Sequence, residues 1–175
     1  MQSSQLIPTH IHSLADYIEE TFKKYANRPA YNALGQTKTF AEIDELSAKF
    51  ANYLLENTDL APGDRIAIQL PNLIQHPIAV YGALRAGLIV VNTNPLYTSS
   101  EMQHQFKDSG AKALVILADF LPKYESIKDS VDVTSVIVTS PTQLLTNEVI
   151  TGTDYPCYAH IFDSVSSCNV PQRPA

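Results

Sequence analysis

The fold is decided by the stretch LRAGLIVVNTNP, residues 84–95. Gly87 suits the left-handed conformation that commonly follows the last turn of a helix. The run from Leu88 to Val91 is rich in β-branched residues and too short to cross a membrane. We therefore expect a strand covered on both faces, as in a parallel sheet. This one segment predicts an α/β fold.

Three helix starts on either side of this stretch carry the same capping signature, a hydroxyl residue followed three positions later by an acid. The pairs are Ser13 with Asp16, Thr39 with Glu42, and Thr98 with Glu101. Apolar residues then recur at spacings of three and four, which predicts a helix after each pair. Gly110 ends the third helix. Between the first two helices, residues 29–40 predict a β-hairpin around Gly35.

From Arg65 onward, predicted strands alternate with predicted helices. The strands are expected at residues 65–70, 88–91, 113–117 and 133–139, and the helices from close before Pro77 to Ala86, after Thr98, and near 120–127. This order predicts a mostly parallel sheet with right-handed crossovers and helices on both faces. The fold class is thus α/β, preceded by a helix and a short β-hairpin. We expect Gly82, inside a helix, to permit close approach to a neighbouring element.

The composition changes after Thr139. Beyond it the chain carries few charges, four prolines and many Ser and Thr residues. We expect residues 1–139 to form the α/β unit and residues 140–175 to be an extended, weakly structured tail without a core of its own.

Overall composition excludes several classes of function. The chain has 175 residues, 45% of them apolar, and a net charge of −6, and its only adjacent basic pair is Lys23-Lys24, so a nucleic-acid partner is not expected. No apolar run approaches the roughly 20 residues of a membrane helix. Residues 1–12 lack an apolar signal core. We therefore expect a cytoplasmic location.

The cysteines and histidines give no sign of a metal site. Cys157 and Cys168 form no CxxC pair, so free thiols are favoured over a disulfide. His10 and His12 form an HxH pair that fits a polar N-terminal tail better than a set of ligands. His76 and His104 lie on or beside helices, and nothing local marks either of them as a catalytic base.

No local motif of the sequence indicates a nucleotide-binding site or an acyl-transfer site. Gly82 and Gly87 match the spacing GxxxxG, but Leu88-Ile89 follows where a phosphate-binding loop needs Lys and then Ser or Thr. The pair also ends a helix, where the dipole disfavours phosphate. No GxSxG turn marks a nucleophilic serine. We predict no catalytic, cofactor-binding or metal-binding residue in this chain.

Several segments nevertheless resemble motifs of a known family, and they occur in the same order as the motifs of that family. Residues 39–43 (TFAEI) resemble its first core motif and residues 84–95 its second, with further matches at residues 63–67, 70–72, 94–98 and 108–111. The family is the long-chain fatty acyl-CoA synthetases of the adenylate-forming superfamily, and the resemblance covers about residues 13–139. Both core motifs fall on features we interpret as structural, a helix cap and a helix–strand corner.

The resemblance implies a reaction for the whole enzyme and implies that this chain is only the N-terminal part of that enzyme. Family members form an acyl-adenylate from ATP and a fatty acid with the help of magnesium, and coenzyme A then attacks to give the thioester. The family's glycine-rich loop and its lysine would come beyond Ala175. We therefore expect an N-terminal fragment, inactive alone, whose main partner is the rest of the same polypeptide. Homodimer formation and peripheral attachment to the inner face of the membrane stay open.

Two alternatives remain. One is a free-standing, non-catalytic binding or interaction module derived from the family, which a natural stop after codon 175 would favour. The other is an unrelated flavodoxin-like domain, which would bind its ligand at the carboxyl ends of the strands.

Overall fold

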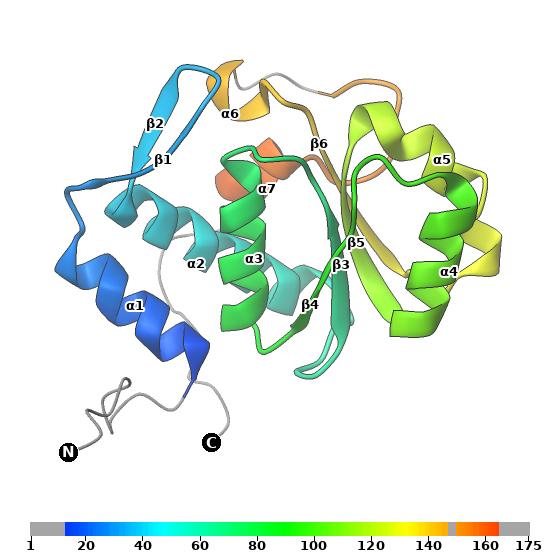
Figure 1. Cartoon of the computed structure of the whole chain (residues 1–175), viewed down its shortest axis with the longest axis horizontal. Coiled ribbons are helices and arrows are strands. Elements are labelled where there is room, and N and C mark those ends of the chain that lie inside the picture. Colours follow the sequence, from blue (N-terminus) through cyan, green and yellow to red (C-terminus); the bar gives the residue numbers. More distant parts are fainter. Residues whose placement is uncertain (1–12, 147–149, 165–175) are drawn as a thin grey trace, which may run out of the picture.

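The computed structural model describes residues 13–146 and 150–164 of the chain. A helix and a β-hairpin come first, and helices then alternate with strands (Figure 1). In chain order the elements are α1 (Leu14–Lys24), β1 (Pro29–Ala33), β2 (Gln36–Thr39), α2 (Phe40–Asn57), β3 (Arg65–Gln69), α3 (Gln75–Arg85), β4 (Ile89–Asn92), α4 (Ser99–Ser109), β5 (Ala111–Leu117), η1 (Ala118–Phe120), α5 (Leu121–Glu125), η2 (Lys128–Ser130), β6 (Ser135–Thr139), α6 (Gln143–Thr146) and α7 (Tyr158–Ser164).

The central sheet confirms the predicted fold class. Four parallel strands lie in the order β4-β3-β5-β6, and β1 pairs with β2 in a separate antiparallel hairpin. Strand β4 is added on one side of β3, and β5 and β6 are then added on the other side. The crossover from β4 to β5 therefore passes over the opposite face of the sheet from the crossover between β3 and β4. The helices α1, α2, α3 and α7 accordingly lie on one side of the sheet, and α4 and α5 lie on the other (Figure 1).

Strand alternation divides the core between the two faces. On β3, Ile66 and Ile68 point to the side of α2 and α3, while Ala67 between them belongs to the cluster that includes Met102 and Phe106 of α4. All five side chains are buried. This alternation is why a short apolar strand can support a helical layer on each face.

The predicted caps and turns are present. Ser13, Thr39 and Thr98 each accept a hydrogen bond from the backbone N–H three residues on, and the acid at that position accepts one from the cap residue in return. The hairpin turns at Leu34 and Gly35, with φ of 51° and 79°. Local sequence therefore sets where these helices and this turn begin.

The helix–strand corner in residues 84–88 has the predicted geometry. Gly87 has φ of 77°, its N–H donates to Leu84 O at 3.1 Å, and the N–H of Leu88 donates to Ala83 O at 2.9 Å. These two bonds form a Schellman motif, which satisfies the last carbonyls of α3. The corner is structural.

The strand that follows this corner differs from the prediction. We expected residues 88–91 to be covered on both faces, but β4 lies at the edge of the sheet and Ile89 is 48% exposed. Leu88, at the corner itself, is buried. Apolar character alone does not separate a central strand from an edge strand, because the order of strands depends on the whole topology.

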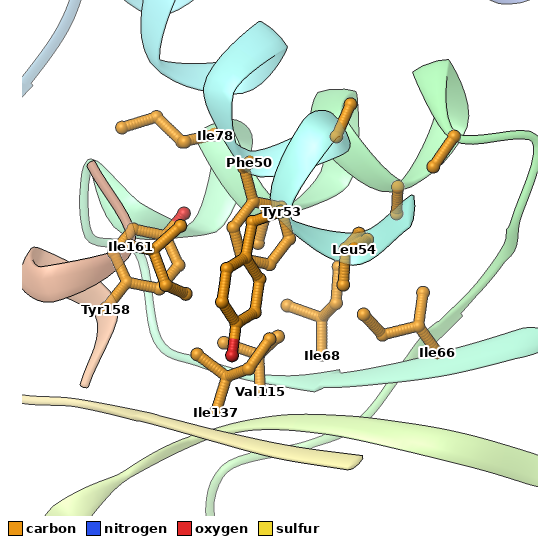
Figure 2. Packing of buried hydrophobic residues seen from close by; sticks show 14 of the residues in the cluster. Phe50, Tyr53, Leu54, Ile66, Ile68, Ile78, Val115, Ile137, Tyr158 and Ile161 are labelled. Carbon is orange, nitrogen blue, oxygen red and sulfur yellow. The ribbon is translucent and has the colours of Figure 1, made fainter. Parts of the chain in front are cut away.

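The segment after Thr139 also differs from the prediction in part. We expected an extended tail, but the described residues include the helices α6 and α7, and Cys157 forms a parallel bridge with Val138 of β6. Tyr158 is fully buried, and its ring centroid lies 5.2 Å from that of Phe50. Figure 2 shows Tyr158 and Ile161 beside Phe50 in the main core. Part of the segment thus completes the core of the preceding unit.

Candidate functional site

A cleft lies between the hairpin and the start of α3. It has a volume of ≈370 Å³, within the range of small-molecule sites. Its walls come from two parts of the chain, β1 on one side and the turn into α3 with its first turns on the other. The lining residues are Tyr31, Asn32, Ala33, Asn72, Leu73, Ile74, His76, Pro77, Val80 and Tyr81.

Local sequence explains how α3 presents its residues to the cleft. The N–H of Leu73 donates to Pro71 O at 2.7 Å, and the N–H of His76 donates to Leu73 O at 3.1 Å, which forms the turn into the helix. The buried side chain of Gln75 donates to Ser140 O at 2.9 Å. This bond ties the first turn of α3 to the carboxyl end of β6.

Two tyrosines join the walls of the cleft. The hydroxyl of Tyr31 on β1 hydrogen-bonds to that of Tyr81 on α3. Burial, and then the neighbouring Tyr81 hydroxyl, raise the pKa of Tyr31. The Tyr31 hydroxyl is therefore neutral at physiological pH, and it and the Tyr81 hydroxyl are hydrogen-bond partners of each other.

Two further polar side chains of the cleft, His76 and Asn32, have hydrogen-bond partners of their own. Burial lowers the pKa of His76, and a side-chain hydrogen bond with Asn92 opposes that effect only in part. The side chain of Asn32 donates to Thr37 Oγ1 at 2.6 Å. The cleft has no Asp, Glu, Lys or Arg in its lining. It is an uncharged, mainly apolar hollow.

A second polar cluster lies on α2 and α3 and holds elements together. Arg85, 3% exposed, donates to Asp44 O at 2.8 Å and also pairs with the Asp44 carboxylate. Its guanidinium lies 3.7 Å from Glu19 and 5.9 Å from the ring centroid of Phe22. These contacts link α1, α2 and α3, so we assign Arg85 a structural role.

The histidines, cysteines and glycines singled out in the sequence do not come together. His76 lines the cleft, whereas His104 lies exposed on α4. Cys157 is buried and free, and Gly82 and Gly87 belong to the packing corner. His10, His12 and Cys168 lie outside the described residues.

The described residues also bear on metals and membranes. Within residues 13–146 and 150–164, no three His, Cys, Asp or Glu residues gather in a way that could hold a metal ion. In the same part of the chain, no helix combines the length and apolar character that crossing a bilayer requires. The cleft, with its uncharged lining, does not fit a magnesium–nucleotide group either.

Sequence reasoning missed the cleft as a site. Tyr31 and Tyr81 are separated by 50 positions, and neither belongs to a local motif. The available signal was weak: a tyrosine in a predicted hairpin strand and another on a predicted helix.

Known proteins place the chain in a family. The model of the AMP-binding enzyme family matches residues 18–163. A long-chain-fatty-acid–CoA ligase of Escherichia coli is 44% identical over 136 residues, which is 78% of this chain and 24% of that protein. A ligase of the same name from Bacillus subtilis is 34% identical over 134 residues, covering 77% of this chain and 24% of that protein. The chain thus spans about a quarter of the length of these relatives.

Solved structures agree on the fold. A Mycobacterium smegmatis protein, MbtA, superposes with a TM-score of 0.77 at 25% identity, over 93% of this chain and 29% of that one. A long-chain-fatty-acid-CoA ligase from Archaeoglobus fulgidus has a TM-score of 0.72 at 23% identity, over 88% of this chain and 30% of that one. With a family model matching most of the chain and bacterial ligases 44% identical to it, the chain belongs to the AMP-binding enzyme family.

Proposed function

We propose that this chain acts as the N-terminal part of a long-chain fatty acyl-CoA synthetase. The observation that carries the proposal is the 44% identity to the Escherichia coli ligase over 136 residues. That identity extends across most of the α/β unit, whose fold the solved structures share. The whole enzyme would convert ATP, a fatty acid and coenzyme A into acyl-CoA, AMP and pyrophosphate through an acyl-adenylate.

In this proposal the chain supplies a scaffold and not the reacting groups. ATP and magnesium would bind to segments beyond the matched quarter of the enzyme, since the described residues offer neither a glycine-rich phosphate loop nor a cluster of metal ligands. Coenzyme A would enter there too. Residues 1–139 would form the N-terminal subdomain, and residues 140–175 would lead toward the nucleotide loop.

The main partner would be the rest of the same polypeptide. Among the strands of the described residues, β4 pairs with β3 alone and so lies at the edge of the sheet, and Ile89 on it is 48% exposed. Leu96, in the loop after β4, is 76% exposed. These apolar side chains support a contact surface at this edge. The proposed enzyme would work in the cytoplasm or at the inner face of the membrane, alone or as a homodimer.

A chimeric enzyme tests the proposal. The 136-residue segment of the Escherichia coli ligase that this chain matches is replaced by the corresponding residues of this chain. We expect the purified chimera to form palmitoyl-CoA. A chimera that folds, binds ATP and yet makes no thioester would contradict the proposal.

The alternative, a free-standing binding module, is favoured by one observation, the cleft of ≈370 Å³ that this chain forms by itself. The isolated chain separates the two functions. The synthetase proposal predicts no fatty-acid-dependent ATP–pyrophosphate exchange by these 175 residues, and adding the chain as a separate protein should not change the exchange rate of an intact ligase. A module that regulates the ligase in trans would change that rate.

A further inference from the structure

We propose that His76 is a pH-sensitive latch, which ties the first turn of α3 to the end of the edge strand β4 at neutral pH and releases it in mild acid. The link is a side-chain hydrogen bond between His76 and Asn92. His76 is the second residue of α3, and Asn92 is the last residue of β4. The bond therefore joins the helical layer on one face of the sheet to the strand at the edge of that sheet.

The end of β4 is held from both faces of the sheet, since α3 and α4 lie on opposite sides of it (Figure 1). From the side of α4, the side chain of Gln105 donates to Asn92 O at 3.1 Å. In the ladder, the N–H of Thr93 donates to Ile68 O at 3.1 Å. Among the described strands, β4 pairs with β3 alone. Loss of the His76 bond therefore leaves this end held by the contact with α4 and by the ladder with β3.

The surroundings of His76 suit a neutral imidazole better than a charged one. The cleft that the ring lines has no Asp, Glu, Lys or Arg, and its other titratable side chains are Tyr31 of β1 and Tyr81 of α3. The sequence of β4 is IVVN, which has no titratable side chain. The first turn of a helix also disfavours a positive charge. An imidazolium in the cleft thus faces no carboxylate that could pair with it.

Protons favour a ring that has left the cleft. Burial lowers the pKa of His76 below its ordinary value of 6.5, and the hydrogen bond to Asn92 offsets this effect only in part. A ring that turns out into water regains the ordinary pKa. As the pH falls below about 6.5, the turned-out ring is therefore increasingly favoured, and its bond to Asn92 is lost. His76 is only half-buried, so a rotation of its side chain is enough.

Release affects two places at once. The cleft loses the ring from its lining, and β4 gains freedom at the end away from Ile89, whose exposed side chain belongs to the contact surface proposed above. Mild acid should therefore weaken a contact made through this edge of the sheet.

Hydrogen–deuterium exchange of the whole 175-residue chain, followed by NMR, tests the latch. The reporter is the N–H of Thr93, just beyond β4, which donates to Ile68 O. Between about pH 7.5 and 5, after correction for intrinsic exchange, its protection should fall by about two- to tenfold, the effect expected for the loss of one hydrogen bond. The fall should follow the titration of the His76 ring protons. At the acid end, Thr93 should be less protected than Val115 in the middle of the sheet.

A neutral replacement and a matched control identify the group that titrates. His76→Gln puts an uncharged amide in place of the ring, so the protection of Thr93 should stay constant over this pH range. His104→Gln makes the same change at the exposed histidine of α4 and should follow the natural chain. Asn92→Ala, at an exposed position, removes the partner instead. In this variant Thr93 should be weakly protected at neutral pH already and should lose nothing further in acid, which tests the latch even if His76→Gln fails to fold.

The direct sign of release is loss of the nuclear Overhauser effect between the His76 ring and the Asn92 side-chain amide in mild acid. Ring signals that titrate while this effect persists would overturn the inference. A fall in Thr93 protection that survives in His76→Gln, or that His104→Gln removes, would also overturn it. Equal protection of Thr93 and Val115 in acid would do the same, because exchange would then require global unfolding. These measurements use neither ATP nor a fatty acid, so their outcome is independent of the synthetase proposal.

Discussion

Gly82 lies so close to Phe50 that a Cβ at position 82 would stand 2.7 Å from Phe50 Cδ1 and 2.9 Å from the carbonyl oxygen of Ser47. Helix α3 therefore approaches α2 to a distance that only glycine permits. In an ordinary helix interior, Gly→Ala stabilises by roughly 0.5–1 kcal/mol. Here we expect Gly82→Ala to lower the free energy of unfolding by about 1–3 kcal/mol, because the buried ring must shift. Urea unfolding measures this change.

The Phe50→Leu background supplies the control for this prediction. With the ring removed, Gly82→Ala should cost less than it does in the natural sequence, but part of the cost should remain because the Ser47 carbonyl oxygen would still lie 2.9 Å from the new Cβ. Equal costs in both backgrounds would mean that Phe50 does not limit the approach of the two helices.

Gly87 gives a second stability prediction. Gly87→Ala should cost about 1–2 kcal/mol, because an L side chain is strained at φ of 77° and its Cβ would lie 3.2 Å from Pro62 Cβ. Gly110 is the matched control, since it is also left-handed, at φ of 64°, but has nothing within 4 Å of a Cβ. Gly110→Ala should therefore destabilise by less. The opposite ranking in thermal unfolding would argue against tight packing at the corner.

Tyr158 tests whether α7 is part of the core. Its hydroxyl donates to Gln75 O at 3.0 Å, so Tyr158→Phe should cost about 1 kcal/mol. Tyr158→Ala should cost about 3–5 kcal/mol, the range for large buried aromatic residues. Tyr17→Ala, at a tyrosine 51% exposed, should change the free energy of unfolding by less than about 0.5 kcal/mol. Similar small effects at both tyrosines would mean that α7 does not pack as described.

The lowered pKa of Glu42 leads us to expect that the free energy of unfolding depends on pH. Hydrogen bonds from the Thr39 backbone, and then from Lys38, lower the pKa of Glu42 from 4.5 to about 2. A carboxyl whose pKa is lower in the folded state stabilises fully above the unfolded value and loses that contribution as pH falls through the folded one. The contribution should therefore disappear between about pH 4.5 and 2. The group is partly exposed, so solvent screening keeps the effect small.

Glu42→Gln isolates this effect, because Gln retains an acceptor for the capping bond but does not titrate. Melting temperatures recorded from pH 6 downward should fall less steeply for Glu42→Gln than for the natural chain. Glu56→Gln, at an exposed position near the other end of α2, should follow the natural profile. A Glu42→Gln profile parallel to the natural one would contradict the prediction.

Local features of the fold could be predicted from the sequence because their causes are local. The capping pairs at Ser13, Thr39 and Thr98 place helix starts through bonds that span three residues. Gly87 marks the end of α3 through its own backbone conformation. The alternation of apolar strands and helices then gives the parallel sheet.

Features that depend on distant contacts could not be predicted in the same way. The edge position of β4 follows from strand order, so the apolar run at Ile89 did not reveal its exposure. Tyr158 lies in a polar segment, and only its contact with Phe50 makes it a core residue. The cleft needs Tyr31 and Tyr81 to meet across 50 positions. Resemblance identified the family, but neither local pattern nor resemblance pointed to this cleft.

The central claim, that this chain is the working N-terminal part of a fatty acyl-CoA synthetase, is tested most directly by the Escherichia coli chimera. The measurement is palmitate-dependent exchange of labelled pyrophosphate into ATP, with the parent ligase as reference and the isolated 175-residue chain as the negative control. We expect exchange by the chimera within about tenfold of the parent, a difference of about 1.4 kcal/mol in the activation barrier, and no exchange by the isolated chain. A folded chimera without exchange, or exchange by the isolated chain, would contradict it.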